Sequence, residues 1–153
     1  MNRVRWIALG VAALAAVVVA FVLLRPRGAA SPSTLIDDFH TVERRCLSTF
    51  NDALHRQAAN QLDELGLADV LDREVLPPWS AFRARVAGLP VPADQGALYA
   101  ALLRYLDDRE TAWRAFSAAL HARDDAAARP HYATYHQKNA EAMRDAQALA
   151  PLL

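Results

Sequence analysis

Cysteine is almost absent from this 153-residue chain, in which Cys46 is the only one. A single cysteine excludes an intramolecular disulfide framework and any metal site built on several thiolates. Cys46 falls on the apolar face of a predicted helix, and no cluster of positive charge shares that face. We therefore interpret Cys46 as a small buried hydrophobic residue with an inert thiol.

The short motifs that carry common chemistries are missing as well. The chain has no glycine-rich phosphate loop, no Gly-x-Ser-x-Gly elbow, no His-Glu-x-x-His and no Cys-x-x-Cys. The sequence therefore nominates no catalytic residue, no cofactor-binding residue and no metal ligand. We expect a protein that is not an enzyme and that carries no cofactor.

Two aspartate–histidine pairs come closest to a metal-binding pattern. Asp37 and His40, and likewise Asp52 and His55, stand about one helical turn apart. The pairs are 15 residues apart in the sequence, about 22 Å along a helix, so they cannot share one ion. None of the five glutamates occurs in the Glu-x-x-His arrangement of di-iron bundles. We interpret both pairs as polar residues of a helix surface.

Negative charge is missing from the first part of the chain. All 17 acidic residues follow Pro32, whereas four of the 17 basic residues lie at positions 1–27. The remainder holds thirteen basic and seventeen acidic residues, a net charge of −4. This mild acidity gives no electrostatic basis for binding nucleic acid or anionic lipid headgroups. Alanine and arginine are abundant and lysine occurs once, a composition typical of a GC-rich bacterial genome.

The longest apolar run without a charge extends from Trp6 to Leu24. As a helix, these 19 residues are about 28 Å long, close to the hydrocarbon thickness of a bilayer. The apolar core of a signal peptide is shorter, about 7 to 15 residues, and leads directly to small residues at a cleavage site. Here the segment Arg25-Pro26-Arg27 intervenes. We therefore predict an uncleaved transmembrane anchor.

Positive charge on both sides of the run indicates its direction. Arg3, Arg5 and the terminal amine outweigh Arg25 and Arg27, which favours a cytoplasmic N-terminus. We expect a single-pass protein of the bacterial inner membrane with a periplasmic C-terminal domain. Its predicted parts are a cytoplasmic segment 1–5, an anchor 6–24, a tether 25–33 and a helical bundle domain 34–150.

Apolar residues recur at spacings of three and four beyond the tether, which is typical of amphipathic helices. A first helix is predicted from Ser33 or Thr34 to a C-cap at Gly66. A second extends from Leu67 to a loop at Gly88 and is kinked or split at Pro77-Pro78. A third follows a cap at Asp94 and ends near Leu120, and a fourth begins at Asp124-Asp125, with Pro130 bending or delaying its start. The fold class is therefore all-α: the N-terminal transmembrane helix followed by an antiparallel four-helix bundle with a proline-interrupted second helix.

The fourth predicted helix carries the densest group of polar and aromatic residues. Its expected inward stripe is Tyr132, Tyr135, Asn139, Met143, Ala146 and Leu149. His131 shares a face with Tyr135, whereas His136 points elsewhere. The group of His131, Tyr132, Tyr135 and His136 is either a ligand, proton-sensing or partner-contact site, or a set of packing tyrosines whose hydroxyls reach water or a neighbouring helix. Asn139 either fixes the helix register or lies at the edge of the stripe.

Trp79 and Trp113 are the largest apolar side chains of the domain, and we expect both in the core. The proline break before Trp79 leaves an alternative, in which this tryptophan is exposed and contacts a partner. Glu110 and Arg114 have the spacing of an exposed ion pair on one helix.

The stretch Leu71-Asp72-Arg73-Glu74-Val75-Leu76-Pro77-Pro78-Trp79, with Leu102-Leu103-Arg104-Tyr105 after it, resembles helical extramembrane segments that accompany bacterial rhomboid-type membrane proteins. The catalytic serine motif and the multi-span core of that family are absent from this sequence, so the resemblance implies no protease activity. It implies an auxiliary helical module kept beside a membrane.

Together these patterns predict a membrane-anchored envelope protein whose bundle is a non-enzymatic interaction or accessory module. Its partners are the membrane, through residues 6–24, and another envelope protein, but not nucleic acid. The alternative is a bundle of the sensory type that binds a small ligand or a metal ion.

Overall fold

The computed structural model describes residues 32–122 and 124–153, which fall in one compact unit. The predicted cytoplasmic segment 1–5, the anchor 6–24 and most of the tether lie outside these residues, so the anchor stays a prediction. Within the described ranges every regular element is helical, and none of the helices has the length and apolar character needed to cross a membrane.

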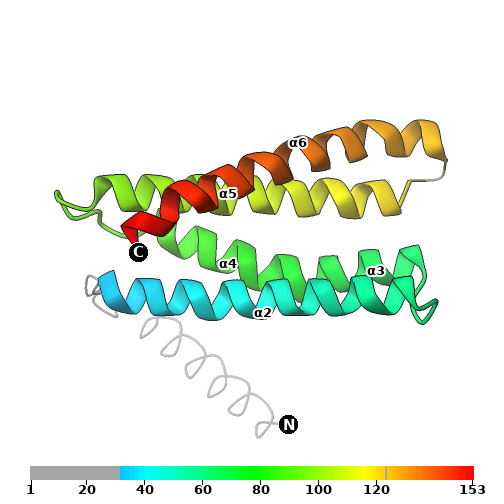
Figure 1. Cartoon of the computed structure of the whole chain (residues 1–153), viewed down its shortest axis with the longest axis horizontal. Coiled ribbons are helices and arrows are strands. Elements are labelled where there is room, and N and C mark those ends of the chain that lie inside the picture. The colour runs from blue at the N-terminus through cyan, green and yellow to red at the C-terminus, as the bar shows by residue number, and fades with distance from the viewer. Residues whose placement is uncertain (1–31, 123) are drawn as a thin grey trace, which may run out of the picture. The chain divides into compact units, whose positions relative to one another are not determined.

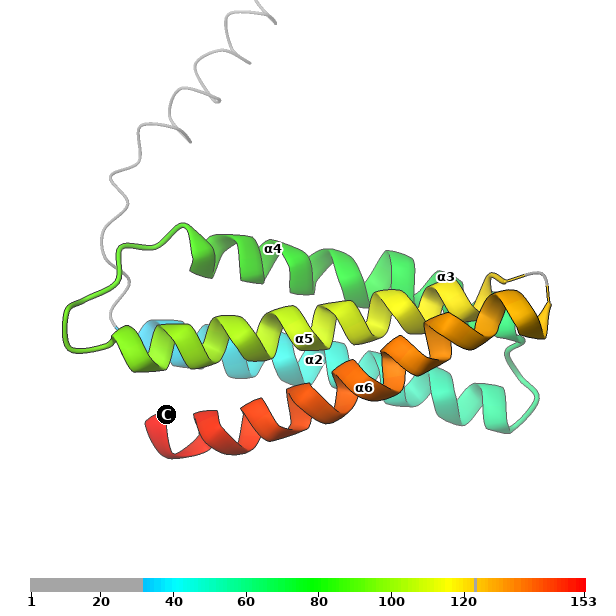
Figure 2. The ribbon, with the colours of Figure 1, turned by 90° about the horizontal axis from the view of Figure 1, so that it is seen from above.

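The helices run up and down along one long axis (Figure 1). Their bounds are α2 Pro32–Ala58, α3 Glu64–Val70, the π-helical turn η1 Leu71–Val75, α4 Leu76–Ala87, α5 Gly96–Leu120, α6 Asp125–Leu149 and the 3-10 turn η2 Ala150–Leu152. Because α3, η1 and α4 follow one another without a break, they act as one long helix beside α2, while α6 lies against α5 (Figure 2). The predicted all-α helical bundle is confirmed.

An aromatic core joins α2, α4 and α5. The Trp79 ring lies edge-on to Trp113, with centroids 4.9 Å apart, and to Tyr105 at 5.8 Å. Trp79 is 0% exposed, and its indole N–H donates to the Leu106 carbonyl at 3.0 Å, so that burial leaves no polar atom unsatisfied. Phe39 and Phe50 of α2 extend the cluster at its two ends. The expected core positions of both tryptophans are confirmed.

The first helix ends at Ala58, so its predicted extension to Gly66 is wrong. Asn60 has a φ of 55°, in the left-handed region that stops a helix and that asparagine adopts more readily than most residues. Asp63 then caps α3, because its carboxylate accepts a hydrogen bond from the Gly66 N–H at 2.7 Å. Gly66 therefore belongs to the first turn of α3 and is no C-cap. The apolar side chain of Leu62 continued the spacing of α2 through this turn and concealed it.

The second helix is irregular at the predicted place, yet the chain stays helical through it. The N–H of Leu76 donates to the carbonyl of Leu71, five residues back, in a π-helical turn. Pro77 and Pro78 then occupy the first positions of α4, where the missing N–H groups are tolerated best. The wide turn thus carries the chain past both prolines without a split.

The predicted starts of the last two helices have different outcomes. The predicted start of the last helix at Asp124-Asp125 is confirmed, since α6 begins at Asp125, and the Asp124 carboxylate caps it by accepting a hydrogen bond from the Ala127 N–H at 2.9 Å. Asp94 does not cap α5, which begins at Gly96 after Gln95 and has no side-chain cap. The prediction for Asp94 placed the start of this helix too early.

Two features of α6 differ from the sequence prediction. Pro130 lies inside the helix, so the alternative of a delayed start is wrong, since α6 already begins at Asp125. Met143 is 55% exposed rather than inward-facing, and the neighbouring Ala142 is buried in its place. The inward face of α6 is therefore made of smaller residues than the apolar spacing suggested.

Candidate functional site

The group predicted on α6 is divided by the fold. The Tyr135 ring stacks on Phe116 of α5, with centroids 4.7 Å apart and planes inclined by 26°, and the Tyr132 ring lies 6.2 Å from the same phenylalanine. His131 and His136 are exposed, although the His136 ring lies 5.2 Å from Tyr135. The two tyrosines thus attach α6 to α5, which is the packing alternative.

A surface hollow of about 260 Å³ adjoins this group. It is lined by Asp125, Ala128, Arg129 and Tyr132, all on the first two turns of α6. Of the four predicted residues, the structure brings Tyr132 alone to this hollow. This hollow therefore does not bring the predicted group together.

Trp79 is enclosed on all sides, so the alternative that exposes it to a partner is wrong. The prolines before it lie in the first turn of α4 instead of opening a loop, and the helix turns the indole inward. Asn139, by contrast, lies half-buried at the border between α5 and α6. Its side-chain oxygen accepts a hydrogen bond from Arg109 at 2.6 Å, a polar contact that ties the register of α6 to that of α5.

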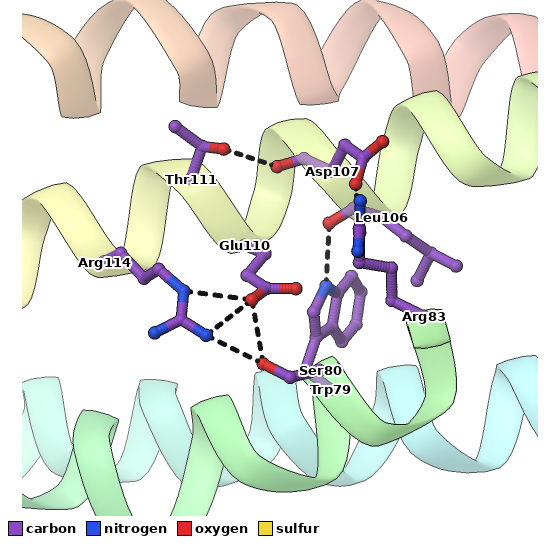
Figure 3. A network of polar contacts seen from close by, with 8 residues as sticks. All are labelled: Trp79, Ser80, Arg83, Leu106, Asp107, Glu110, Thr111 and Arg114. Carbon is purple, nitrogen blue, oxygen red and sulfur yellow. Dashed lines mark hydrogen bonds and ion pairs between the residues drawn. The ribbon is translucent and has the colours of Figure 1, made fainter. Parts of the chain in front are cut away.

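Polar side chains join α4 to α5 beside the buried tryptophan (Figure 3). Glu110 accepts hydrogen bonds from the Ser80 hydroxyl at 2.9 Å and from two guanidinium nitrogens of Arg114 at 2.9 and 2.6 Å. The Glu110 side chain is 14% exposed, so the predicted pair with Arg114 forms but is not a simple surface pair. Arg83 and Asp107 make a further contact between the same helices. The arrangement fixes α4 on α5.

A serine, an aspartate and a histidine meet where α5 ends. The Ser117 hydroxyl donates to Asp72 at 2.7 Å, and the His121 ring nitrogen Nε2 lies 3.0 Å from the other oxygen of the same carboxylate. In a hydrolase triad the histidine must lie between the serine and the carboxylate to accept the serine proton. Here the carboxylate lies in the middle, so these residues hold the end of α5 to the π-helical turn and activate no nucleophile.

Charged residues along α5 and α6 pair with each other across the helix border. Lys138 donates to Asp108 at 2.9 Å and to Glu141 at 2.5 Å, and these carboxylates raise the pKa of its ammonium. Asp145 lies beside Asp108. Burial raises the pKa of the Asp145 carboxyl, and the neighbouring Asp108 raises this pKa further. The one lysine of the chain thus links α6 to Asp108 of α5 and pairs with Glu141 of its own helix.

A groove runs between α2 and α4 and has a volume of about 280 Å³. Its lining consists of Asp38, Thr41, Val42, Pro78, Ala81, Phe82 and Arg85. Asp38 and Arg85 form an ion pair at 2.8 Å across it, and the Arg85 guanidinium also lies 4.9 Å from the Phe82 ring centroid. The groove therefore has an apolar floor, and the Asp38–Arg85 ion pair crosses it at the surface.

A smaller pocket of about 200 Å³ lies between α2, α5 and the end of α6. Within it the Tyr105 hydroxyl donates to Glu43 at 2.6 Å, and the His40 ring nitrogen Nδ1 lies 3.9 Å from the other Glu43 oxygen. Burial, reinforced by this carboxylate, raises the pKa of Tyr105, which therefore stays a neutral phenol. The rest of the lining is mostly apolar: Phe39, Ala146, Leu149, Ala150 and Leu153.

The aspartate–histidine pairs of α2 do not act as units. His40 approaches Glu43, and Asp52 pairs with Arg56 at 3.9 Å instead of with His55. Across residues 32–122 and 124–153, no three side chains of the metal-ligating kinds gather in one place.

Comparisons with protein-family models, with curated proteins and with solved structures found no match for this chain. The resemblance to segments of rhomboid-type membrane proteins therefore stays a prediction. The structure shows two hollows that the sequence did not predict, the groove between α2 and α4 and the Glu43–Tyr105 pocket. Sequence reasoning missed both, because their walls come from residues far apart in the chain.

Proposed function

We propose that residues 34–150 are the interaction module of a single-pass bacterial envelope protein. Residues 6–24 hold it in the inner membrane, the bundle lies in the periplasm, and its partner is another envelope protein. The observation that carries the proposal is the groove between α2 and α4.

The size of the groove suits a side chain of a partner protein. Small-molecule sites commonly measure about 300–1,000 Å³, so a groove of about 280 Å³ falls just below that range. Val42, Ala81 and Phe82 offer an apolar floor for an anchoring residue, the kind of contact that dominates protein–protein affinity. A partner would bury this floor together with its rim.

The ion pair between Asp38 and Arg85 can orient a partner that binds in the groove. Asp38 and Arg85 are both partly exposed, and an exposed ion pair contributes only about 0–1 kcal/mol to stability. Either charge can therefore turn toward a partner at little cost to the fold. Complementary charges at the rim would then select the partner and speed its association.

The groove wall is also rigid. Pro78 lines it at the beginning of α4, directly after the π-helical turn. A wall with a fixed φ loses little conformational entropy on binding, which favours association. The α2 residues of the groove begin six residues after Pro32, about 9 Å along the helix, so the groove lies toward the end of the bundle that the predicted tether precedes.

Reversal of one charge tests the use of the groove. We expect Arg85→Glu in the full-length tagged protein to abolish in-cell capture of an envelope partner, because it removes the positive rim charge beside Asp38. Arg56→Glu is the matched control, since it breaks an exposed ion pair of α2 that lies outside the groove. Equal capture by both variants and the wild-type chain would show that the groove does not bind the partner.

The Glu43–Tyr105 pocket favours ligand binding as a second candidate function. A carboxylate beside the aromatic rings of Phe39, His40 and Tyr105 has the chemistry that binds a small organic cation. We expect ethanolamine or tetramethylammonium to raise the melting temperature of the full chain in a concentration-dependent manner. Glu43→Gln should remove this rise, and a rise that persists in Glu43→Gln would place the binding elsewhere.

A further inference from the structure

Exposed large apolar side chains gather at one end of the bundle. Five are exposed among the residues that the structure describes, and three of them belong to segments at this end: Val91 at 51%, Leu152 at 43% and Leu153 at 40%. Val91 belongs to the loop between α4 and α5, and the two leucines follow α6. We call the end formed by Pro32, the loop 88–95 and residues 150–153 the proximal end (Figures 1 and 2).

The backbone at the proximal end suits an apolar environment. Pro90 and Pro92 flank Val91, and Pro151 precedes the two leucines. Proline has no N–H group, so these segments carry fewer donors that would lose water on entering lipid. Leu89 packs against the core and fixes the base of the loop. The exposed apolar side chains are thus displayed on short, restrained segments.

The proximal end contains Pro32, the first residue that the structure describes, so the predicted tether joins the bundle there. Seven residues, 25–31, separate the apolar run 6–24 from Pro32, and they reach at most about 25 Å when fully extended. If residues 6–24 span a bilayer, Pro32 lies within that distance of its surface, and the proximal end, which contains Pro32, is the end of the bundle that the tether joins.

We infer that the proximal end rests in the interfacial layer of the lipid bilayer, with Val91 and Leu152 inserted among the headgroups. The inference rests on the proposed anchor. The contact is apolar, because a domain of net charge −4 is not drawn to anionic headgroups. It gives the bundle two points of attachment, the tether and the inserted end, and so restricts the direction in which the α2–α4 groove faces.

Fluorescent labelling of single cysteines tests the insertion in the full-length protein. Cys46 is fully buried and its thiol is protonated at neutral pH, so an introduced exposed cysteine is labelled selectively. The variants are Val91→Cys, Leu152→Cys and, as the matched control, Leu65→Cys, which replaces another exposed large apolar residue, beyond the opposite end of α2. Each is labelled with an environment-sensitive dye and reconstituted into phosphatidylcholine vesicles.

We expect lipids with spin-labelled acyl chains to quench the dyes at 91 and 152, with loss of emission, and to leave the dye at 65 unchanged. Iodide in the aqueous phase should quench the dye at 65 strongly and the dyes at 91 and 152 weakly. In vesicles that carry the protein on flotation, equal iodide quenching at all three positions would overturn the inference while leaving the anchor intact. Protection from iodide without quenching by lipid would also overturn it, in favour of a second copy. Failure of the protein to float with the vesicles would refute the anchor itself, and the insertion with it.

Discussion

The two sides of the bundle are held together by different means. α2, α4 and α5 enclose large side chains, with Trp79, Trp113 and Phe39 almost wholly buried among them. α6, which the structure describes in full, buries three residues, and two of these are alanines. Its attachment to α5 depends instead on the tyrosines that stack on Phe116 and on polar bridges such as Lys138 to Asp108. The difference indicates that stability is concentrated in three helices, while α6 can open separately.

Removal of the central indole should break the three-helix side. We expect Trp79→Ala to lower the free energy of unfolding by about 3–5 kcal/mol, the usual cost of a large cavity in a core. Urea titration followed by circular dichroism measures the change. Met143→Ala, on the exposed face of α6, is the control and should alter stability by less than about 0.5 kcal/mol. Similar losses in the two variants would refute the comparison.

Alkaline pH should lower the free energy of unfolding of the side formed by α2, α4 and α5, because the buried Cys46 thiol must then ionise. Burial raises the pKa of Cys46 from 9.0 to about 11, so the folded state favours the neutral thiol. The resulting stability is fully present below pH 9 and is lost as the pH rises toward 11, by about 2–3 kcal/mol in all. Cys46→Ala should lack this part of the pH dependence. An unchanged slope in that variant would show that the thiol does not titrate with folding.

Loss of the stacked ring should release α6 and little else. We expect Tyr135→Ala to cost about 1–2 kcal/mol, since it removes an aromatic pair and part of its buried area. Hydrogen exchange should speed up for the amides of α6 and stay slow in α2 and α4. His136→Ala, at the adjacent exposed position, provides the matched control. Uniform acceleration across all helices would mean that α6 unfolds only together with the rest.

The smallest effect should come from the charges between α5 and α6. The pKa of Asp145 is raised in the folded state, so its ionised form opposes folding, and the penalty is present at neutral pH and absent once the group is protonated in acid. We expect Asp145→Asn to stabilise the fold by a few tenths of a kcal/mol at pH 7, with the gain vanishing as the pH falls through the range of the carboxyl pKa. Thermal unfolding at several pH values measures it. Destabilisation at neutral pH would show that the pair with Arg104 outweighs the repulsion from Asp108.

Helical periodicity predicted most of the buried face because it depends on local spacing alone. It placed Phe39 and Cys46 of α2, and Trp79 of α4, on the inward side, where the structure has them. The spacing failed where backbone geometry decides: Leu62 continued the pattern of α2 past Asn60, whose positive φ ends the helix.

The polar contacts of the site were beyond local patterns for another reason. Ser80 meets Glu110, and Glu43 meets Tyr105, across 30 and 62 residues of sequence. Periodicity tells which face of a helix is buried but leaves open which residues of two helices lie opposite each other. Asn139, a polar residue within an apolar stripe, was the one such contact that the sequence signalled, and the structure pairs it with Arg109.

Site-specific photo-crosslinking in living cells tests the proposed interaction most directly. A photoreactive amino acid replaces Ala81 in the groove of the full-length tagged protein and, as the control, Ala140 on the exposed face of α6. We expect one reproducible crosslink to an envelope protein from position 81 and none to that protein from position 140. The same products from both positions, or no product from position 81, would contradict the proposal that the bundle binds a partner through this groove.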